Sequence, residues 1–251
     1  MGASARLFAT MVCSTILFMC QATAIAFPLS SEIPAYGENV VAYGYATPDG
    51  KSEVEYSEIF QDDPLGNTVR VNYYASDGKV IAYKNLEFGA DRNVPEFFEF
   101  IDYRRGRGFR LTVNDKTANL LSLKISADGT ETVRSNNDIE IDKNTVIDAA
   151  FHRFILSDWD SLLAGERRKV KFLRIDKATL IPLKIKRNKC EAPDMICFKI
   201  SIDNMVLQAM LPNIDMQYDN NKNLIRYNGI GPITTLKGKP KPVDIIYGYA
   251  Q

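Results

Sequence analysis

Apolar and polar residues alternate with a period of two along much of the chain. In 181–186, for example, Ile181, Leu183 and Ile185 share one side of an extended segment. Strict alternation of this kind is typical of antiparallel strands with one face in a core and the other in water. The same pattern recurs in the segments 69–74, 121–126, 196–203 and 214–219.

Turn signals separate these segments. Asp-Gly pairs stand at 49–50, 77–78 and 128–129, and a further turn is expected at 219–223. Asp-Gly suits the positive φ angles of tight hairpin turns. The chain therefore has the sequence of a hairpin-rich, mainly β protein.

One segment breaks the alternation. From Asn144 to Ala164, apolar residues recur at spacings of three, four and seven, which defines one helical stripe. Asp142 or Asn144 can cap its start, and Gly165 can end it. At 1.5 Å per residue, the predicted helix is about 30 Å long. The stripe consists of Val146, Ile147, Ala150, Phe151, Phe154, Ile155, Trp159, Leu162 and Leu163.

The two patterns together predict an architecture. About ten strands are expected, and a flat sheet of that size would be about 50 Å wide, whereas a helix is only about 10 Å across. We therefore predict a mainly β (α+β) fold, a strongly curved antiparallel sheet or half-barrel wrapped around one long helix, residues 144–164. A closed eight-stranded barrel with the helix outside is the alternative.

The first 26 residues have the features of a secretory signal peptide. Arg6 is the only charged side chain before Glu32, and an apolar stretch follows it. Small residues then offer cleavage after Ala24 or Ala26. The expected product, 27–251, is a single β-rich domain in the periplasm or outside the cell. An uncleaved membrane anchor is the alternative.

Charge and histidine content narrow the classes of function. The chain has 31 basic and 31 acidic residues and one histidine. This balance argues against binding to nucleic acid, and a single histidine argues against a multi-histidine metal site. We expect no metal and no cofactor.

Two cysteines remain after signal cleavage, Cys190 and Cys197. An even number in an exported protein predicts one disulfide. Strand parity places both thiols on the polar side of two strands that are joined by a short loop. We interpret this bridge as a structural staple rather than a redox site.

His152 is the one candidate for a histidine mechanism. Asp148 precedes it by four residues and is within reach across one helical turn. No nucleophile motif accompanies the pair. We therefore expect a histidine on the helix surface and name no catalytic residue.

Two clusters are candidates for binding. Arginines within Tyr103–Arg110 are interleaved with glycine and aromatic residues, which suits a phosphate or anionic headgroup; a hairpin with arginines on its wet face is the alternative. These arginines are Arg104, Arg105, Arg107 and Arg110. The most aromatic stretch, 97–103, can line an apolar cavity with residues of the helix, or pack in the core. The candidate lining residues are Phe97, Phe98, Phe100, Tyr103, Phe154 and Trp159.

The chain resembles a group of uncharacterised exported, periplasmic proteins of Gram-negative bacteria. The resemblance rests on the segment Asp148–Glu166, with Phe151, Phe154 and Trp159, and on the late segment Tyr218–Ile230. Its architecture is similar to that of the periplasmic lipoprotein-carrier half-barrels, in which a curved sheet holds an apolar cavity. The resemblance supplies no activity and no binding residue that can be transferred to this chain.

Three functions remain open. The first is a non-enzymatic periplasmic protein that binds a lipid or other apolar molecule in a curved-sheet cavity. The second is an envelope protein that acts through a protein-partner surface and has no ligand cavity. The third is an enzyme, for which the sequence offers no motif.

Overall fold

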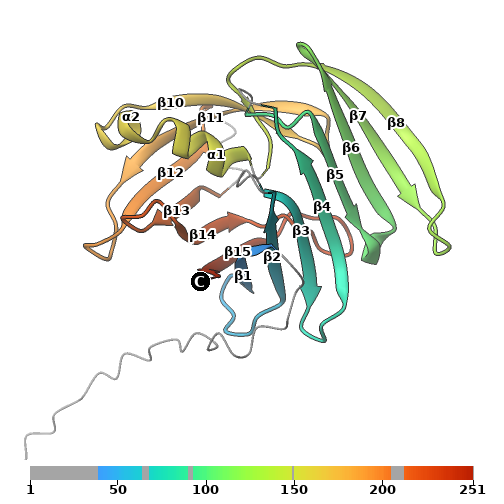
Figure 1. Cartoon of the computed structure of the whole chain (residues 1–251), viewed down its shortest axis with the longest axis horizontal. Helices are drawn as coiled ribbons and strands as arrows, with labels where there is room; N and C mark the ends of the chain where they lie inside the picture. Colours follow the sequence, from blue (N-terminus) through green and yellow to red (C-terminus); the bar gives the residue numbers. More distant parts are fainter. Residues whose placement is uncertain (1–38, 64–67, 90–92, 149, 205–211, 251) are drawn as a thin grey trace, which may run out of the picture. The chain divides into compact units, whose positions relative to one another are not determined.

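Fifteen strands form one sheet in the part of the chain that the structure describes (Figure 1). The structure, a computed structural model, describes residues 39–63, 68–89, 93–148, 150–204 and 212–250. These residues belong to one unit, Tyr36–Gln251. The predicted signal peptide lies outside them.

The strands follow one another closely along the chain. In chain order they are β1 (Val40–Pro48), β2 (Tyr56–Asp62), β3 (Thr68–Ala75), β4 (Val80–Glu87), β5 (Phe97–Asp102), β6 (Arg107–Asn114), β7 (Thr117–Ile125), β8 (Glu131–Glu140), β9 (Thr145–Val146), β10 (Arg168–Arg174), β11 (Thr179–Asn188), β12 (Ile196–Ile202), β13 (Ile214–Tyr218), β14 (Leu224–Ile230) and β15 (Pro242–Tyr249). The helical segments are η2 (Tyr103–Arg105), α1 (Ala150–Ser157) and α2 (Trp159–Leu163).

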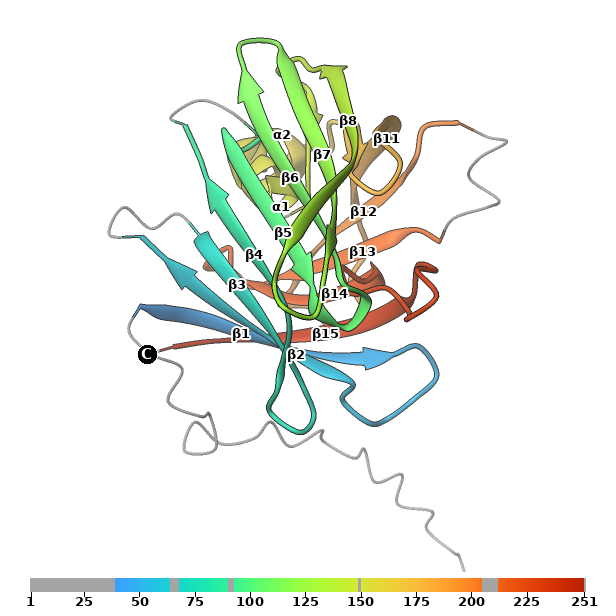
Figure 2. The same cartoon turned by 90° about the vertical axis from the view of Figure 1, so that its right-hand side faces the viewer.

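The first and last strands, β1 and β15, lie side by side in the sheet (Figure 2). On one side of this pair β2 to β8 follow in chain order, and on the other side β14 to β9 follow in reverse order. Neighbouring strands are antiparallel, except that β9 runs parallel to β10. The edges of this open, curved sheet are therefore β8 and β9, which are consecutive in the chain.

The predictions of a mainly β fold and a curved antiparallel sheet are confirmed, but the predicted number of strands is wrong. Fifteen strands replace about ten. The sheet is open, so the alternative of a closed eight-stranded barrel is wrong as well. The Asp-Gly turns form as expected, with φ angles of 72°, 79° and 85° at Gly50, Gly78 and Gly129.

The prediction of one long helix over residues 144–164 is also wrong. Thr145 and Val146 form β9 and pair with β10. These β-branched residues favour extended backbone. The chain then turns at Asp148, where φ is 39°. Asp158, with φ of −103° and ψ of 17°, separates α1 from α2.

The apolar stripe of that segment is nevertheless buried, except for Leu163, which is partly exposed. Helical spacing therefore identified the side chains that enter the core, although the backbone that carries them is a strand, a turn and two short helices. Neither α1 nor α2 is long and apolar enough to cross a lipid bilayer.

Buried apolar side chains form two clusters. The first combines residues of β1 to β7 and β15 with Ile139 of β8 and Leu173 of β10. Because β8 lies at one edge of the sheet and β10 next to the other, the curvature brings both ends into one core. The second cluster packs α1 and α2 against β10 to β14. Tyr227 and Tyr247 contact both clusters, so the clusters share the inner face of the sheet.

Candidate functional site

Charged side chains interrupt the apolar inner face on β2 and β4. Glu58 and Lys84 are only 2% and 3% exposed, and Tyr73 of β3 lies between their strands at 1%. Glu58 stands opposite Tyr73, and Lys84 stands opposite Val71, a core residue. Alternation places these two charges on the buried side of their strands, where an ionised group is costly unless it is paired.

Asp148 supplies the partner of Lys84. It lies in the turn between β9 and α1, and its carboxylate forms an ion pair with the Lys84 ammonium group. An aspartate tolerates the positive φ of this turn better than a bulky residue does. The same ammonium group lies 5.3 Å from the centre of the Tyr73 ring, a cation–π contact.

Glu58 accepts a hydrogen bond from a residue on the other side of β1. The hydroxyl of Tyr247 on β15 donates to Glu58 Oε2 at 3.3 Å. Gly44 of β1 stands between these two residues in the register. A Cβ at Gly44 would lie 2.9 Å from the Tyr247 ring, so glycine makes room for the tyrosine.

Among the residues that the structure describes, two buried polar side-chain atoms have no hydrogen-bond partner, Glu58 Oε1 and the hydroxyl of Tyr56. Tyr56 and Glu58 share the inner side of β2, and Tyr56 is 1% exposed. An unpaired buried polar group costs roughly 1–3 kcal/mol, and a native protein keeps few of them. Burial raises the pKa of Tyr227, and the charges of Asp148 and Glu58 are close enough to add to that rise. We call these residues together the inner polar centre, which consists of Tyr56, Glu58, Tyr73, Lys84, Asp148, Tyr227 and Tyr247.

Burial controls the protonation of the inner polar centre. Loss of hydration raises the pKa of Glu58 to about 7; the positive charge of Lys84 opposes this rise, and the negative charge of Asp148 adds to it. Burial also raises the pKa of Tyr56, Tyr73 and Tyr247 well above the ordinary value. The phenols therefore remain hydrogen-bond donors, whereas Glu58 gains or loses a proton near neutral pH.

The six aromatic residues proposed to line a cavity are distributed over several environments. Phe98 and Phe100 lie in the first core cluster, and Phe154 and Trp159 lie in the second. Phe97 is partly exposed, and Tyr103 is 53% exposed.

Phe100 adjoins the inner polar centre. It stands opposite Lys84, and its ring meets the Tyr73 ring edge-on at 6.3 Å between centroids. The role of all six aromatic residues in ligand binding stays a prediction.

Two open hollows lie elsewhere on the described residues. One, of about 450 Å³, lies between the end of β8 and the turn from β10 to β11. The other, of about 430 Å³, lies between Arg104 and the loop before β15. Neither is lined by the six aromatic residues or opens at Glu58.

The four candidate arginines do not all face one surface. Arg110 is held on the outer side of β6 by salt bridges to Glu99 at 2.6 Å and Glu131 at 3.1 Å. Arg107 is exposed at the start of β6. Arg110 is thus engaged with carboxylates, while Arg107 faces solvent.

The other two arginines bind the loop before β15. Arg104 forms a salt bridge to Asp102 at 2.7 Å and donates to the Thr234 carbonyl at 3.0 Å. Arg105 donates to the Thr234 hydroxyl at 3.0 Å. Anion binding by these arginines stays a prediction.

Asp148, which the sequence places within reach of His152, pairs with Lys84 instead. His152 Nδ1 lies 3.2 Å from the Tyr218 hydroxyl, and the two rings are nearly parallel. Burial lowers the pKa of His152 to about 4. The expectation of a histidine on the helix surface is therefore wrong, since the ring is half-buried against β13.

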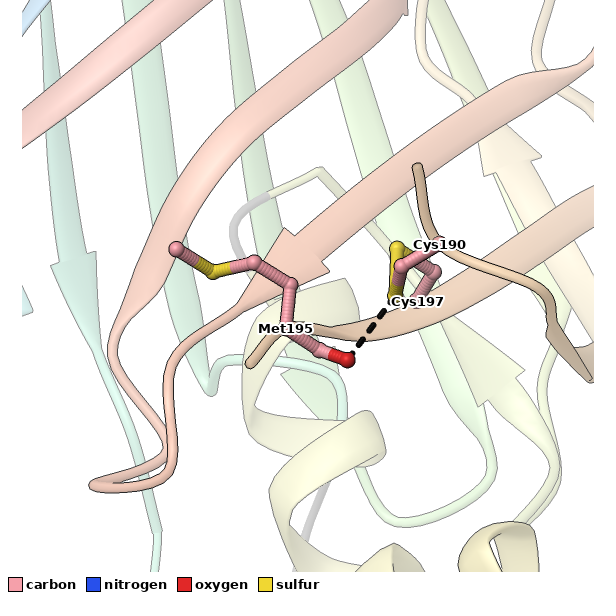
Figure 3. The surroundings of a disulfide bond; sticks show 3 residues. All are labelled: Cys190, Met195 and Cys197. Atoms are coloured by element: carbon pink, nitrogen blue, oxygen red, sulfur yellow. Dashed lines mark hydrogen bonds between the residues drawn. A yellow bond between two sulfur atoms is a disulfide. The ribbon is translucent and has the colours of Figure 1, made fainter. Parts of the chain in front are cut away.

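The predicted disulfide between Cys190 and Cys197 is present, with 5.4 Å between the Cα atoms (Figure 3). The Cys190 sulfur also lies 2.9 Å from the main-chain oxygen of Met195, inside the closed loop. Cys197, expected on the polar side of its strand, is only 6% exposed, as is Ser201 on the same strand. The bridge therefore fastens a partly covered strand, β12, to the residues after β11.

The inner polar centre was missed by sequence reasoning, although part of its signal is visible. Glu58 alternates with Tyr56 and Phe60, and Lys84 alternates with Ala82 and Leu86. A charged residue on the apolar side of a strand is the available sign of a buried ionisable group. Among the described residues, no group of three or more histidine, cysteine, aspartate or glutamate side chains is arranged to hold a metal ion.

Comparison with known proteins gives no family for the chain. No protein-family model matches it, and a comparison with curated proteins found no match. A β-barrel-like protein of domain of unknown function DUF1849 from Brucella abortus aligns over 84% of this chain and 98% of its own, with 9% identity and a TM-score of 0.42. A porin-like protein from Bacteroides uniformis aligns over 84% and 96%, with 8% identity and a TM-score of 0.26. At these TM-scores, neither likeness defines a function.

Proposed function

We propose that this chain is a non-enzymatic periplasmic protein that binds a lipid or other apolar ligand on the inner face of its curved sheet. The observation that carries the proposal is the pair of unpartnered buried atoms, Glu58 Oε1 and the Tyr56 hydroxyl. They lie within an apolar face, so a molecule with an apolar body and a hydrogen-bonding head matches both chemistries.

The head group is expected to be neutral or cationic rather than anionic. Lys84 is already paired with Asp148, and Glu58 adds a negative charge when it ionises. An alcohol, amide or amine head would satisfy Glu58 and Tyr56, whereas a carboxylate would meet repulsion.

Native mass spectrometry of protein purified from its host envelope tests this proposal. We expect a non-covalent mass in addition to the polypeptide, released by organic extraction and identified as an apolar molecule. Glu58→Gln should reduce its occupancy, while Glu53→Gln, a change at an exposed glutamate, should not. Polypeptide mass alone, with no apolar molecule extracted, would overturn the proposal.

Export is part of the same proposal. Residues 1–26 act as the signal peptide, and cleavage after Ala24 or Ala26 releases the chain into the periplasm. Amino-terminal sequencing of protein from the periplasmic fraction should begin at Ile25 or Phe27. Intact Met1 in a membrane fraction would support the uncleaved anchor instead.

The alternative is an envelope protein that acts through a partner surface, and one observation favours it. Strand β8 is an edge of the described sheet, and most of its ten residues are exposed. A free edge can accept an extended strand from another protein. A photo-crosslinker at Val133 of β8 should then trap one defined partner, whereas the same group at Val80 of β4 should not. Equal labelling from both sites would reject this alternative.

A further inference from the structure

Two basic segments that are distant in sequence meet on the outside of the molecule. The loop before β15 is held to the η2 turn by the hydrogen bonds from Arg104 and Arg105 to Thr234. Gly238 of that loop has φ of 76°, and a Cβ there would lie 2.4 Å from the Arg105 guanidinium group. We call the residues 103–107 and 234–241 together the basic patch.

Some cations of the basic patch form no salt bridge to a carboxylate of the described residues. Arg104 is paired with Asp102, and Lys241 is paired with Glu55. In the described part of the chain, no salt bridge joins the remaining four cations of the patch to an acid. These four are Arg105, Arg107, Lys237 and Lys239, and all but the half-buried Arg105 are exposed.

The basic patch also contains a large, exposed apolar side chain, Leu236. Leu236 is 71% exposed and is followed directly by Lys237. Tyr103, in the other segment of the basic patch, is 53% exposed. Exposed leucine is unfavourable in water, whereas leucine and tyrosine flanked by lysine and arginine suit the boundary between lipid headgroups and acyl chains.

The hollow of about 430 Å³ lies within this surface. Its lining consists of Leu236, Thr235, the cations Arg104, Lys237, Lys239 and Lys241, and Glu55, whose carboxylate is paired with Lys241. A phosphate group that enters it would meet several cations at once, with an apolar side chain at its rim. The cations, the exposed leucine and the hollow together fit the headgroup region of an anionic lipid membrane better than they fit a protein or a free anion.

We propose that the basic patch docks the protein on the surface of a membrane that contains anionic phospholipid. Leu236 enters the headgroup region, and the unpaired lysines and arginines bind lipid phosphates. The basic patch shares no residue with the inner polar centre, so a test of membrane docking does not depend on whether the proposed ligand binds.

Vesicle flotation of the full chain tests the docking surface, with phosphatidylcholine vesicles that either contain or lack phosphatidylglycerol. We expect binding only to the phosphatidylglycerol vesicles, and weaker binding as salt rises. Lys237→Gln with Lys239→Gln should weaken binding by more than tenfold, since each cation near an anionic surface contributes roughly a fivefold factor. Leu236→Ser should weaken it at unchanged charge.

Matched controls separate the patch from general effects. Lys143→Gln with Lys177→Gln removes two exposed lysines elsewhere, and Val133→Ser removes another exposed apolar side chain. Neither should change flotation, and thermal unfolding should show all variants folded. The proposal would be overturned if the two double lysine variants bound equally well, or if the parent protein did not bind phosphatidylglycerol vesicles. Full release of the protein from the vesicles by inorganic phosphate would also overturn it.

Discussion

Lys84 of β4 and Asp148 of the turn before α1 form an ion pair between residues 64 positions apart in the chain. The lysine side chain is 4% exposed and the aspartate side chain is 24% exposed. The pair therefore links the β2–β4 region of the sheet to the segment that begins the helices, and it keeps a buried ammonium group compensated.

Removal of one member of this pair should destabilise the fold strongly. Asp148→Asn keeps a residue that tolerates positive φ but leaves Lys84 buried without a counter-charge. We expect a loss of about 3 kcal/mol in the free energy of unfolding, measured by urea denaturation. Combining it with Lys84→Met should recover most of that loss. Strictly additive losses in the double variant would contradict this account.

Glu58 should make the protein less stable as pH rises toward neutrality. Its pKa is about 7 in the fold against 4.5 as a free side chain, so between these values the folded state holds the proton that the unfolded state has lost. This contribution to stability is fully present below pH 4.5 and is lost as pH rises through 7.

Glu58→Gln removes that dependence. Above pH 7 the variant should be more stable than the parent by up to about 3 kcal/mol, and the advantage should shrink on acidification. Chemical denaturation across this range, with Glu53→Gln as the exposed control, measures the difference. A constant offset between variant and parent at every pH would argue against titration of Glu58 within the fold.

His152 should give the opposite slope. Burial lowers its pKa from 6.5 to about 4, so the unfolded state binds a proton that the fold rejects between these values. Stability should therefore fall as pH drops from 6.5 toward 4. His152→Leu should reduce the loss in the free energy of unfolding between pH 6.5 and 4 by about 2 kcal/mol, a figure that allows for partial exposure of the ring. If the variant lost as much stability in acid as the parent, His152 would be excluded as the cause.

The disulfide between Cys190 and Cys197 closes a short loop, with a sequence separation of 7. On the chain-entropy account such a loop stabilises the fold by about 2–3 kcal/mol. The double variant Cys190→Ala with Cys197→Ala should lose that amount in denaturation experiments. Reduction of the parent protein should cause the same loss in the free energy of unfolding. Addition of reductant to the double variant should leave its free energy of unfolding unchanged. A large effect of reductant on the double variant would point to another cause.

Alternation in the sequence predicts the strands that have one apolar face, and Asp-Gly predicts their turns. It does not predict β8, whose residues are nearly all exposed, or β9, which has only two residues. Those strands depend on pairing with neighbours rather than on a core-facing side, so the alternation underestimates the number of strands. Helical spacing likewise selected buried residues around Trp159 without revealing that Thr145 and Val146 join a strand.

The inner polar centre shows the same division. Strand parity marks Glu58 and Lys84 as charges on an apolar side, which is a local property of the sequence. The partners, Asp148 and Tyr247, come from segments that reach the site only through the curvature and strand order of the sheet. No local pattern could pair a glutamate of β2 with a tyrosine of β15, 189 positions later.

The pairing of β1 with β15 has a consequence for the order of folding. Within β2 to β8, and within β9 to β14, each strand pairs with the next strand along the chain, so the pairing in each half can form early. The joint between the halves needs Ala42 to meet Tyr249, the largest separation among the paired strands. Formation of such a contact is slow because a long loop must close first. We therefore expect the sheet to be completed only after the carboxyl-terminal strand β15 is available to pair with β1.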